Sequence, residues 1–281
     1  MRHSTNRVLT THTGSLPRPA GLLRMVYARQ EGKTLDEQTF DAELSRAVAD
    51  AVRRQRAAGV DIVSDGEMGK PGYSTYVAER LSGFSGQGRL PPPADLIDFP
   101  AYADRVMSEP ALRALAMPAC TGEIRYRGTA ALDRDLAFFR AALADSPATD
   151  AFVSAASPGV IALFLENQYY PTEERYLEAL AEAMRVEYEA IHRAGFLLQV
   201  DCPDLAMGRH MQRSNVTLEE FRRTAALHVE VLNHALSRIP PESLRMHLCW
   251  GNYEGPHHHD VQLADIIDIE LTTAVRSAHV L

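Results

Sequence analysis

The chain has 281 residues, 46% of them hydrophobic, and its 29 basic and 37 acidic side chains give a formal net charge of −8. This length and ordinary composition suit one large α/β domain and exclude the disordered and fibrous classes. The acidic balance argues against a nucleic-acid scaffold. Because no apolar run is long enough to span a bilayer and the N-terminus lacks the apolar core of a signal peptide, we expect a cytoplasmic protein without membrane or nucleic-acid partners.

In the first half of the chain, a helix is predicted over residues 34–58, with Thr34 as N-cap, Glu37 three residues later and Gly59 as the stop. A strand follows over 60–65. Residues 82–100, rich in glycine and containing Pro91, Pro92 and Pro93, are predicted to form an irregular loop, either a lid or an insertion. A weaker strand candidate covers 118–126.

The second half repeats the alternation of helix and strand. Helices are predicted over 132–143, 172–194 and 218–236, and strands over 151–156, 196–200 and 244–249. Thr217 and Glu220 are spaced as a capping box for the last of these helices. Strands that alternate with helices of this length are typical of parallel βαβ units, in a barrel or a doubly wound sheet.

Polar residues follow at least four of the strands, at their carboxyl ends: Asp65, Glu67, Ser157, Asp201, His247 and Cys249. Side chains that converge from the ends of many strands favour a (β/α)8 TIM barrel. A doubly wound dinucleotide fold is disfavoured because no G-x-G-x-x-G motif is present. We therefore predict a single barrel-type domain over residues 1–281, with residues 1–20 as an N-terminal arm over the barrel mouth.

His247-Leu248-Cys249 is the sharpest chemical feature. Alternate residues of a strand point to the same face, so the imidazole and the thiol can converge on one point, and both are good zinc ligands. A half-buried His beside a core Cys would give the same triplet. The metal interpretation is favoured because Gly251 follows closely and lets the backbone approach a ligand.

The acidic candidates are Glu67 and Asp201, although either one alone also fits a helix cap or a surface carboxylate. Pro203 breaks the strand after Asp201, which leads us to expect both Asp201 and Asp204 at the rim. The turn-rich arm over 11–19 would present the Ser15 hydroxyl to an anion. His257, His258 and His259 are expected to form a polar loop beside the site, because consecutive loop residues rarely converge on one ion.

Five blocks together resemble the cobalamin-independent methionine synthase superfamily, in its single-domain branch that includes the epoxyalkane:coenzyme M transferases. They are THTGSLPRP (11–19), GVDIVSDGEMGK (59–70), SPGVIALFLENQYYP (157–171), GFLLQVDCPDLAMGRH (195–210) and MHLCWGNYEGPHHHD (246–260). The last block looks closer to the coenzyme M transferase branch. The resemblance covers nearly the whole chain, to about Ile269.

The resemblance implies a (β/α)8 barrel with zinc at its carboxyl-terminal mouth, where a substrate thiol is bound as thiolate and attacks an electrophilic carbon. By position, His247 and Cys249 match two zinc ligands. Ser15 matches a residue at the carboxylate of the amino-acid substrate, and Glu67 and Asp201 match residues at its amine. The implied activity is thiol S-alkyl transfer, with Glu67 and Asp201 as the catalytic carboxylates.

Two thiol substrates stay open. Paired carboxylates suit an ammonium-bearing thiol such as homocysteine, with a methyl donor as the second substrate. They suit the sulfonate of coenzyme M poorly, unless Arg18 or Arg209 offsets their charge.

The sequence changes character near Glu270, and residues 270–281 are predicted to form a divergent tail. The family's remaining zinc ligands, an acidic residue and a second Cys, come from later barrel strands, and no Cys follows Cys249. We therefore expect an incomplete barrel that lacks its last strands, so an inactive truncated remnant is an alternative to the alkyltransferase. A metal-free uroporphyrinogen-decarboxylase-like barrel is disfavoured, because it would need a cationic mouth.

Overall fold

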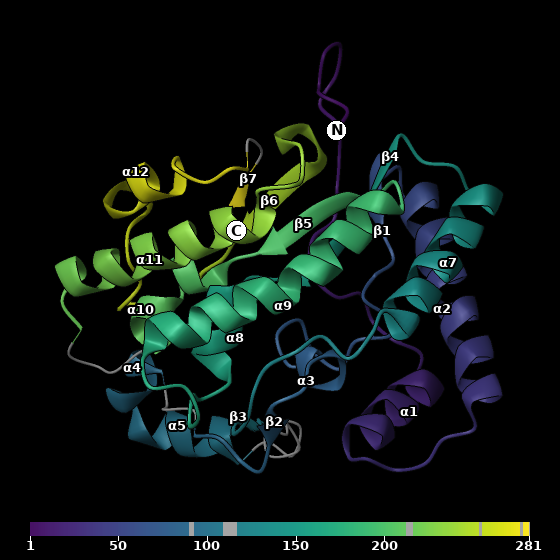
Figure 1. Cartoon of the computed structure of the whole chain (residues 1–281). Coiled ribbons are helices and arrows are strands. Elements are labelled where there is room, and N and C mark those ends of the chain that lie inside the picture. Colours follow the sequence, from purple (N-terminus) through teal and green to yellow (C-terminus); the bar gives the residue numbers. More distant parts are fainter. Residues whose placement is uncertain (90–92, 109–116, 212–215, 253–254, 276–277, 281) are drawn as a thin grey trace.

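The computed structural model describes residues 1–89, 93–108, 117–211, 216–252, 255–275 and 278–280, so Pro91 and Pro92 of the expected loop lie outside the described residues. Its centre is a parallel sheet with the strand order β1-β4-β5-β6-β7 (Figure 1). The strands are β1 (Ile62–Ser64), β4 (Asp150–Ala156), β5 (Leu197–Asp201), β6 (Leu244–Leu248) and β7 (Ala278–Val280).

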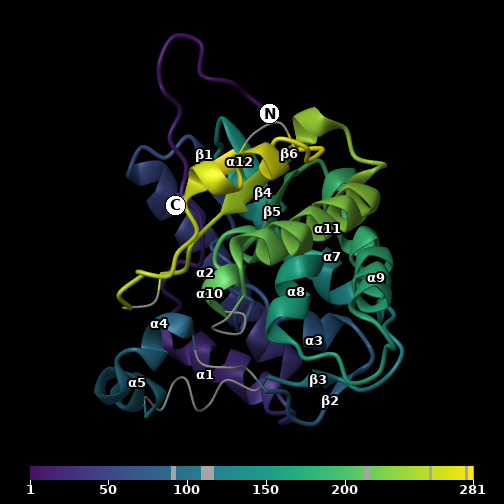
Figure 2. The ribbon, with the colours of Figure 1, turned by 90° about the vertical axis from the view of Figure 1, so that its left-hand side faces the viewer.

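Long helices cover one face of this sheet. In Figure 2 α9 and α11 lie on one side of the strands and the N-terminal segment runs along the other. The helices that contact the strands or one another on this layer are α2 (Glu37–Ala57), α7 (Ala130–Asp145), α8 (Pro158–Phe164), α9 (Glu173–Arg193) and α11 (Leu218–Leu236). Among the described residues, no helix is long and apolar enough to cross a membrane.

The remaining elements are short and lie mainly at the carboxyl-terminal end of the sheet or along its rim. They are α1 (Ala20–Gln30), α3 (Val77–Arg80), α4 (Ala94–Ile97), α5 (Pro100–Met107), α10 (Gly208–Met211), α12 (Ile267–Glu270) and three 3-10 turns at Pro203–Leu205, Pro241–Ser243 and Leu263–Asp265. Strands β2 (Phe84–Ser85) and β3 (Ala119–Cys120) form a separate antiparallel pair. The segment 82–100 therefore contains a short strand and a helix.

One of the two predicted N-caps is present, and α9 has a threonine cap that was not predicted. The Thr172 hydroxyl accepts a hydrogen bond from the Arg175 N–H at the start of α9, and Thr217 and Glu220 form the expected capping box of α11. The predicted cap of α2 is wrong. Asp36, not Thr34, caps that helix, because its carboxylate accepts the backbone N–H of Gln38.

The sheet is open within the described residues, in agreement with the incomplete barrel that the sequence predicts. At one edge the N-terminal arm adds a parallel bridge between Thr11 and Ile62, and at the other edge stands β7. The strand predicted over 118–126 is wrong for most of its length. Only Ala119–Cys120 is extended, and it pairs with β2 outside the main sheet.

The two faces of the sheet differ in polarity along the strands. The face toward α9 and α11 is apolar throughout and joins the main core through Val63, Val153, Leu198, Val200, Met246 and Leu248. A buried aliphatic side chain contributes about 1.5–3 kcal/mol, so this layer holds the helices in place. The opposite face is apolar only near the amino ends, where Ile62, Phe152 and Leu197 form a second cluster. Toward the carboxyl ends it becomes polar.

Candidate functional site

A cavity of 390 Å³ opens at the carboxyl ends of β5 and β6 and takes in the segment that follows β1. The residues of this cavity that matter for its chemistry are Ser15, Glu67, Tyr73, Asp201, His247 and Cys249. The structure thus brings together the five site residues predicted from the sequence, while their roles stay predictions. Parallel strands place such side chains together because their carboxyl ends meet at one edge.

Asp201 and His247 occupy paired positions in the register of β5 and β6. His247 Nδ1 lies 3.1 Å from Asp201 Oδ1, which also accepts a hydrogen bond of 2.8 Å from Gln199 Nε2. A carboxylate can only accept, so Nδ1 carries a proton, and in the neutral ring Nε2 carries the lone pair. His247 Nε2 is buried and makes no hydrogen bond with any described residue. A metal-binding imidazole is commonly held by a carboxylate in this way.

Cys249 follows two residues after His247 and lines the same cavity, as the alternation of the strand predicts. Burial raises the pKa of the Cys249 thiol, but the neighbouring His247 imidazole and the Gly251 N–H outweigh it, and the net pKa lies below its usual value. Burial likewise lowers the pKa of His247, while Asp201 and Cys249 together raise it to about 9. Without a metal ion, the pair therefore favours a thiolate beside a protonated imidazole.

Glu67 reaches the cavity through a strained turn. Its φ of 56° lies in the left-handed region, and Asp65 supports the turn by accepting the Glu67 N–H at 2.9 Å. The Ser15 hydroxyl donates to Glu67 Oε2 at 2.5 Å and so holds this carboxylate. Burial above all raises the pKa of Glu67; the charge of Lys70 opposes this and that of Asp201 adds to it. Two acidic groups thus share one buried space.

The two arginines that could offset these acids do not line the cavity. Arg18 Nη2 instead donates to the backbone carbonyls of Glu67 at 2.8 Å and Lys70 at 2.6 Å, which fastens the arm to the turn after β1. Among the described residues that line the cavity there is no Arg or Lys. The cavity is therefore suited to a cationic rather than an anionic group.

The expectation that Asp204 stands at the rim is wrong. Its side chain is 2% exposed, and its two oxygens bind the Ser157 hydroxyl at 2.7 Å and His228 Nδ1 at 2.8 Å. Ser157 in turn caps α8 by accepting the N–H of Val160 at 3.0 Å. Asp204 and Ser157, both at strand ends, thus support the helix layer instead of the cavity.

Two residues that line or support the cavity, Gln199 and Tyr73, were not predicted from the sequence. Gln199 lies two residues before Asp201 on the same strand face, so the alternation of β5 was a signal that could have found it. Tyr73 lines the cavity from a loop whose sequence carries no such signal, and burial, followed by nearby acids and Cys249, raises its pKa. Glu270 is also buried, but it does not line the cavity; both its carboxylate oxygens lack a described partner.

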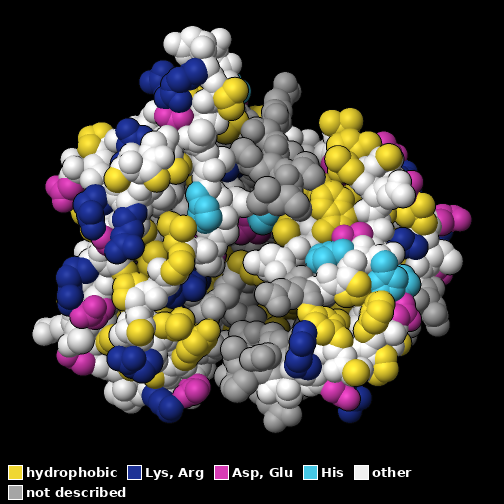
Figure 3. Space-filling model, turned by 180° about the vertical axis from the view of Figure 1, so that it is seen from behind, with side chains coloured by type: hydrophobic (Ala, Val, Ile, Leu, Met, Phe, Trp, Pro, Cys, Tyr) yellow, Lys and Arg dark blue, Asp and Glu magenta, His cyan; other side chains and the backbone are white. Residues whose placement is uncertain are grey.

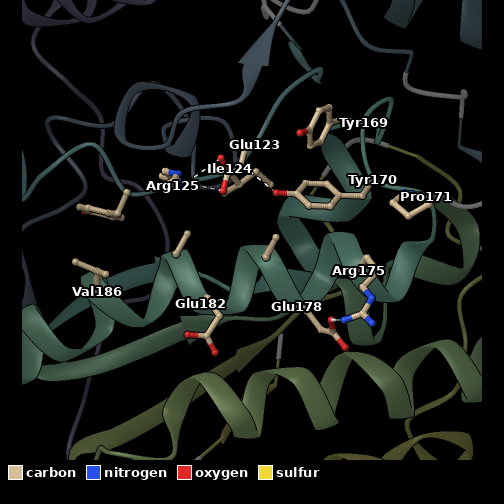
Figure 4. Close-up of a pocket in the computed structure, with 13 residues that line it drawn as sticks. Glu123, Ile124, Arg125, Tyr169, Tyr170, Pro171, Arg175, Glu178, Glu182 and Val186 are labelled. Carbon is tan, nitrogen blue, oxygen red and sulfur yellow. Dashed lines mark hydrogen bonds and ion pairs between the residues drawn. The ribbon is translucent and has the colours of Figure 1, made fainter.

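Other surface hollows carry less chemistry. A larger cavity of 790 Å³ lies beside α9, where Figure 4 shows Tyr169, Tyr170 and Pro171 above Arg175 and Glu178. Arg175 of this cavity pairs with Glu178 at 2.8 Å, and no cluster of nucleophiles or metal ligands converges among its described lining residues. The face of the molecule turned away from the viewer in Figure 1 carries several histidine side chains across its middle (Figure 3).

The sequence and the fold both have relatives among known proteins. The family model "Cobalamin-independent synthase, Catalytic domain" matches residues 8–89. Methionine synthases from Thermococcus kodakarensis and Saccharolobus solfataricus are each 26% identical, over 245 and 260 residues, which is 87% and 92% of this chain. The chain spans 62% and 68% of the lengths of these two relatives.

Solved structures agree at the level of the fold. A B12-independent methionine synthase from Shewanella sp. W3-18-1, in complex with selenomethionine, superposes with a TM-score of 0.64 at 20% identity over 88% of this chain and 63% of its own. A putative vitamin-B12 independent methionine synthase from Listeria monocytogenes gives 0.60 at 18% identity, over 88% and 68%. The chain is similar to methionine synthases over most of its length, and its first third matches the cobalamin-independent synthase family. The resemblance that its motifs indicate is confirmed, while the coenzyme M transferase branch stays a prediction.

Proposed function

We propose that this relative of the methionine synthases is a zinc-dependent thiol S-alkyltransferase whose thiol substrate also carries an ammonium group, as homocysteine does. The observation that carries the proposal is the convergence of His247, Cys249, Asp201, Glu67 and Ser15 in one cavity at the carboxyl ends of parallel strands. The alkyl group transferred would be a methyl group, by analogy with the named activity of the relatives.

The residues present fit a zinc ion. His247 Nε2 is buried without a described partner, and the Cys249 thiol beside it has a lowered pKa. Imidazole nitrogen and thiolate sulfur are preferred zinc ligands. Among the described residues, no further His, Cys, Asp or Glu atom completes a compact set of three with this pair. A zinc ion held there would supply a Lewis acid that keeps the substrate thiol deprotonated at neutral pH.

The protein residues would bind and orient the substrate. Asp201 holds the protonated Nδ1 of His247 and so directs Nε2 into the cavity. Its second oxygen and the buried carboxylate of Glu67 would bind an ammonium group, whose charge would relieve the repulsion between the two acids. Ser15 would fix the orientation of Glu67 and remain close to the substrate carboxylate.

The charge of the cavity favours an amino thiol over a sulfonate thiol. Coenzyme M would bring a negative sulfonate next to two carboxylates, and like charges at this depth repel strongly. Arg18, which could have compensated, is engaged with backbone carbonyls. Homocysteine is therefore the first substrate to test, and coenzyme M is the alternative.

Cobalt substitution tests the metal part of the proposal. Metal-free protein loaded with Co²⁺ is expected to show a thiolate-to-cobalt absorption band in the near ultraviolet, lost in Cys249→Ser and in His247→Ala. The matched control is Cys202→Ser, which changes a buried thiol that lies outside the cavity. Absence of the band in the wild type would refute a metal site at His247 and Cys249 and would favour the inactive remnant.

A second experiment tests the substrate class. Addition of homocysteine to the cobalt protein is expected to change the band, whereas coenzyme M at the same concentration leaves it nearly unchanged. Glu67→Gln should weaken the response to homocysteine by about tenfold or more, since it removes one hydrogen-bonded charge from the ammonium group. A stronger response to coenzyme M than to homocysteine would overturn the choice of substrate.

A further inference from the structure

Outside the cavity, imidazole and carboxylate groups gather where residues 256–260 meet helix α4. His258 Nε2 and His259 Nε2 lie 2.8 Å and 2.7 Å from the same oxygen of Asp98. His258 Nδ1 lies 3.6 Å from Asp95 Oδ1. His258 and His259 thus converge on one carboxylate oxygen, although consecutive loop residues were not expected to converge on one ion. None of these four side chains lines the cavity of the proposed active site.

The spacing of these groups matches a single metal ion. Asp95, His258 and His259 each offer one ligand atom, and the three atoms lie within 4.8 Å of one another. Ligands about 2.0–2.2 Å from one zinc-sized ion are themselves separated by roughly 3–4 Å. Small side-chain adjustments would therefore bring all three onto one ion.

Asp98 sets the tautomers of both imidazoles. Because a carboxylate can only accept hydrogen bonds, the two Nε2 atoms near Asp98 carry the protons. The lone pair of each ring is then on Nδ1, and in His258 this atom is on the side of Asp95. An imidazole that donates one N–H to a carboxylate while its other nitrogen binds metal is the usual arrangement at protein metal sites.

Burial and access also suit a cation. The Asp95 side chain is 0% exposed and accepts the His259 N–H at 3.0 Å, so its negative charge is held in a medium of low polarity. The His258 and His259 side chains are 39% and 44% exposed, which leaves a route from solvent. A second, overlapping set of Asp95, His210 and Asp260 adds another imidazole and another carboxylate next to the first.

We propose that Asp95, His258 and His259 bind a divalent first-row transition metal ion, with zinc the expected ion, and that Asp98 positions the two imidazoles. Two nitrogen ligands and one carboxylate suit Zn²⁺, Co²⁺ or Fe²⁺ better than Ca²⁺ or Mg²⁺. The ion joins two segments that are separated by 160 residues in the chain. It is a site additional to the one proposed at His247 and Cys249.

The test uses the full chain, freed of metal and titrated with Co²⁺ in equilibrium dialysis and by absorption. The wild type is expected to bind two equivalents. The double variant His258→Ala/His259→Ala should bind one, with the thiolate band intact, and Cys249→Ser should also bind one, without that band. Asp98→Asn should weaken the second site by about 10- to 100-fold. His192→Ala, a histidine of α9 outside both sites, is the matched control.

The outcomes separate this site from the proposed function. If the cavity holds no metal, the wild type is expected to bind a single equivalent of Co²⁺ without a thiolate band, and the double histidine variant to bind none. That result would support the second site and refute the metal site of the proposed function. If the double variant binds as much Co²⁺ as the wild type, or Cys249→Ser binds none, the second site is refuted. Far-ultraviolet circular dichroism checks that the two exposed histidines are replaced without loss of the fold.

Discussion

Gly159, the second residue of α8, is the position where a single methyl group should do most damage near the site. A Cβ at this position would stand 2.8 Å from Asp204 Cγ and still closer to the facing Asp204 oxygen and to His228 Nδ1. The buried contact between Asp204 and His228, 2.8 Å long, would have to open. Because Asp204 also holds Ser157, the cap of α8 would shift as well.

The magnitude follows from two opposing effects. Alanine has an intrinsic advantage of about 1 kcal/mol over glycine inside a helix. Forcing a methyl group into a filled space costs about 1–3 kcal/mol, and separating a buried charged pair costs about 3–5 kcal/mol. The steric and electrostatic costs win, so Gly159→Ala should lower the free energy of unfolding by roughly 3–7 kcal/mol, a large part of the usual total.

Urea unfolding followed by circular dichroism measures this loss, and Gly21→Ala is the matched control. Gly21 also lies in a helix, α1, but nothing stands within 4 Å of an added Cβ, so alanine there should stabilise the protein by about 0.5–1 kcal/mol. In a His228→Ala background the Gly159→Ala loss should shrink, since one of the two obstructing groups is absent. If Gly159→Ala raised the free energy of unfolding as much as Gly21→Ala does, the steric explanation would be refuted.

Three further predictions concern stability. Thr217→Ala removes the capping box with Glu220 and should cost about 1 kcal/mol in urea unfolding; an unchanged midpoint would contradict this. Arg80→Met leaves the 1%-exposed Glu187 carboxylate without its cation and should cost about 3–5 kcal/mol, partly recovered when Glu187→Gln is added; no recovery would count against the ion-pair explanation. Burial raises the pKa of Glu270 to about 8, so above the unfolded pKa near 4.5 the folded state holds a proton that the unfolded state releases, and stability falls as pH rises between these values. In metal-free protein, Glu270→Gln should therefore match the wild type at pH 4 and have a higher thermal midpoint at pH 8. Its advantage in the free energy of unfolding should grow by up to roughly 1.4 kcal/mol per pH unit, and a difference between the two proteins that does not depend on pH would contradict this explanation.

The parts of the fold that sequence alone predicts are those with a strong local signal. Helices α9 and α11 have long amphipathic patterns and Thr caps, and both begin where the sequence indicates. The cap of α2 is misplaced because Asp36 and Thr34 are both good capping residues, and only the three-dimensional path of the chain separates them. Strand alternation is equally informative, since by itself it predicts that His247 and Cys249 share one face, and both line the cavity.

Non-local packing explains the errors. Asp204 has the sequence signature of a rim carboxylate, but His228 from α11 comes to meet it and makes it part of the core. The local sequence around His258 and His259 gives no sign of convergence, because the partner that gathers them, Asp98, is 160 residues away in the chain. The role of Arg18 is open in the sequence for the same reason, since its backbone acceptors lie beyond β1. A local pattern cannot report such partners.

The polarity gradient of the inner sheet face links the fold to the proposed chemistry. Near the amino ends Ile62, Phe152 and Leu197 close this face with apolar contacts. Near the carboxyl ends Asp201 and Glu67 are buried, and burial above all, with a smaller contribution from the charge of Asp201, raises the pKa of Glu67. Two such acids oppose folding unless a cation or a proton compensates one of them. The fold tolerates this cost because the apolar layer beneath α9 and α11 is continuous and independent of the cavity. A bound ammonium group would remove the repulsion, so substrate affinity and protein stability should increase together. At a fixed saturating concentration, an amino thiol that binds should raise the thermal midpoint roughly with the logarithm of its affinity.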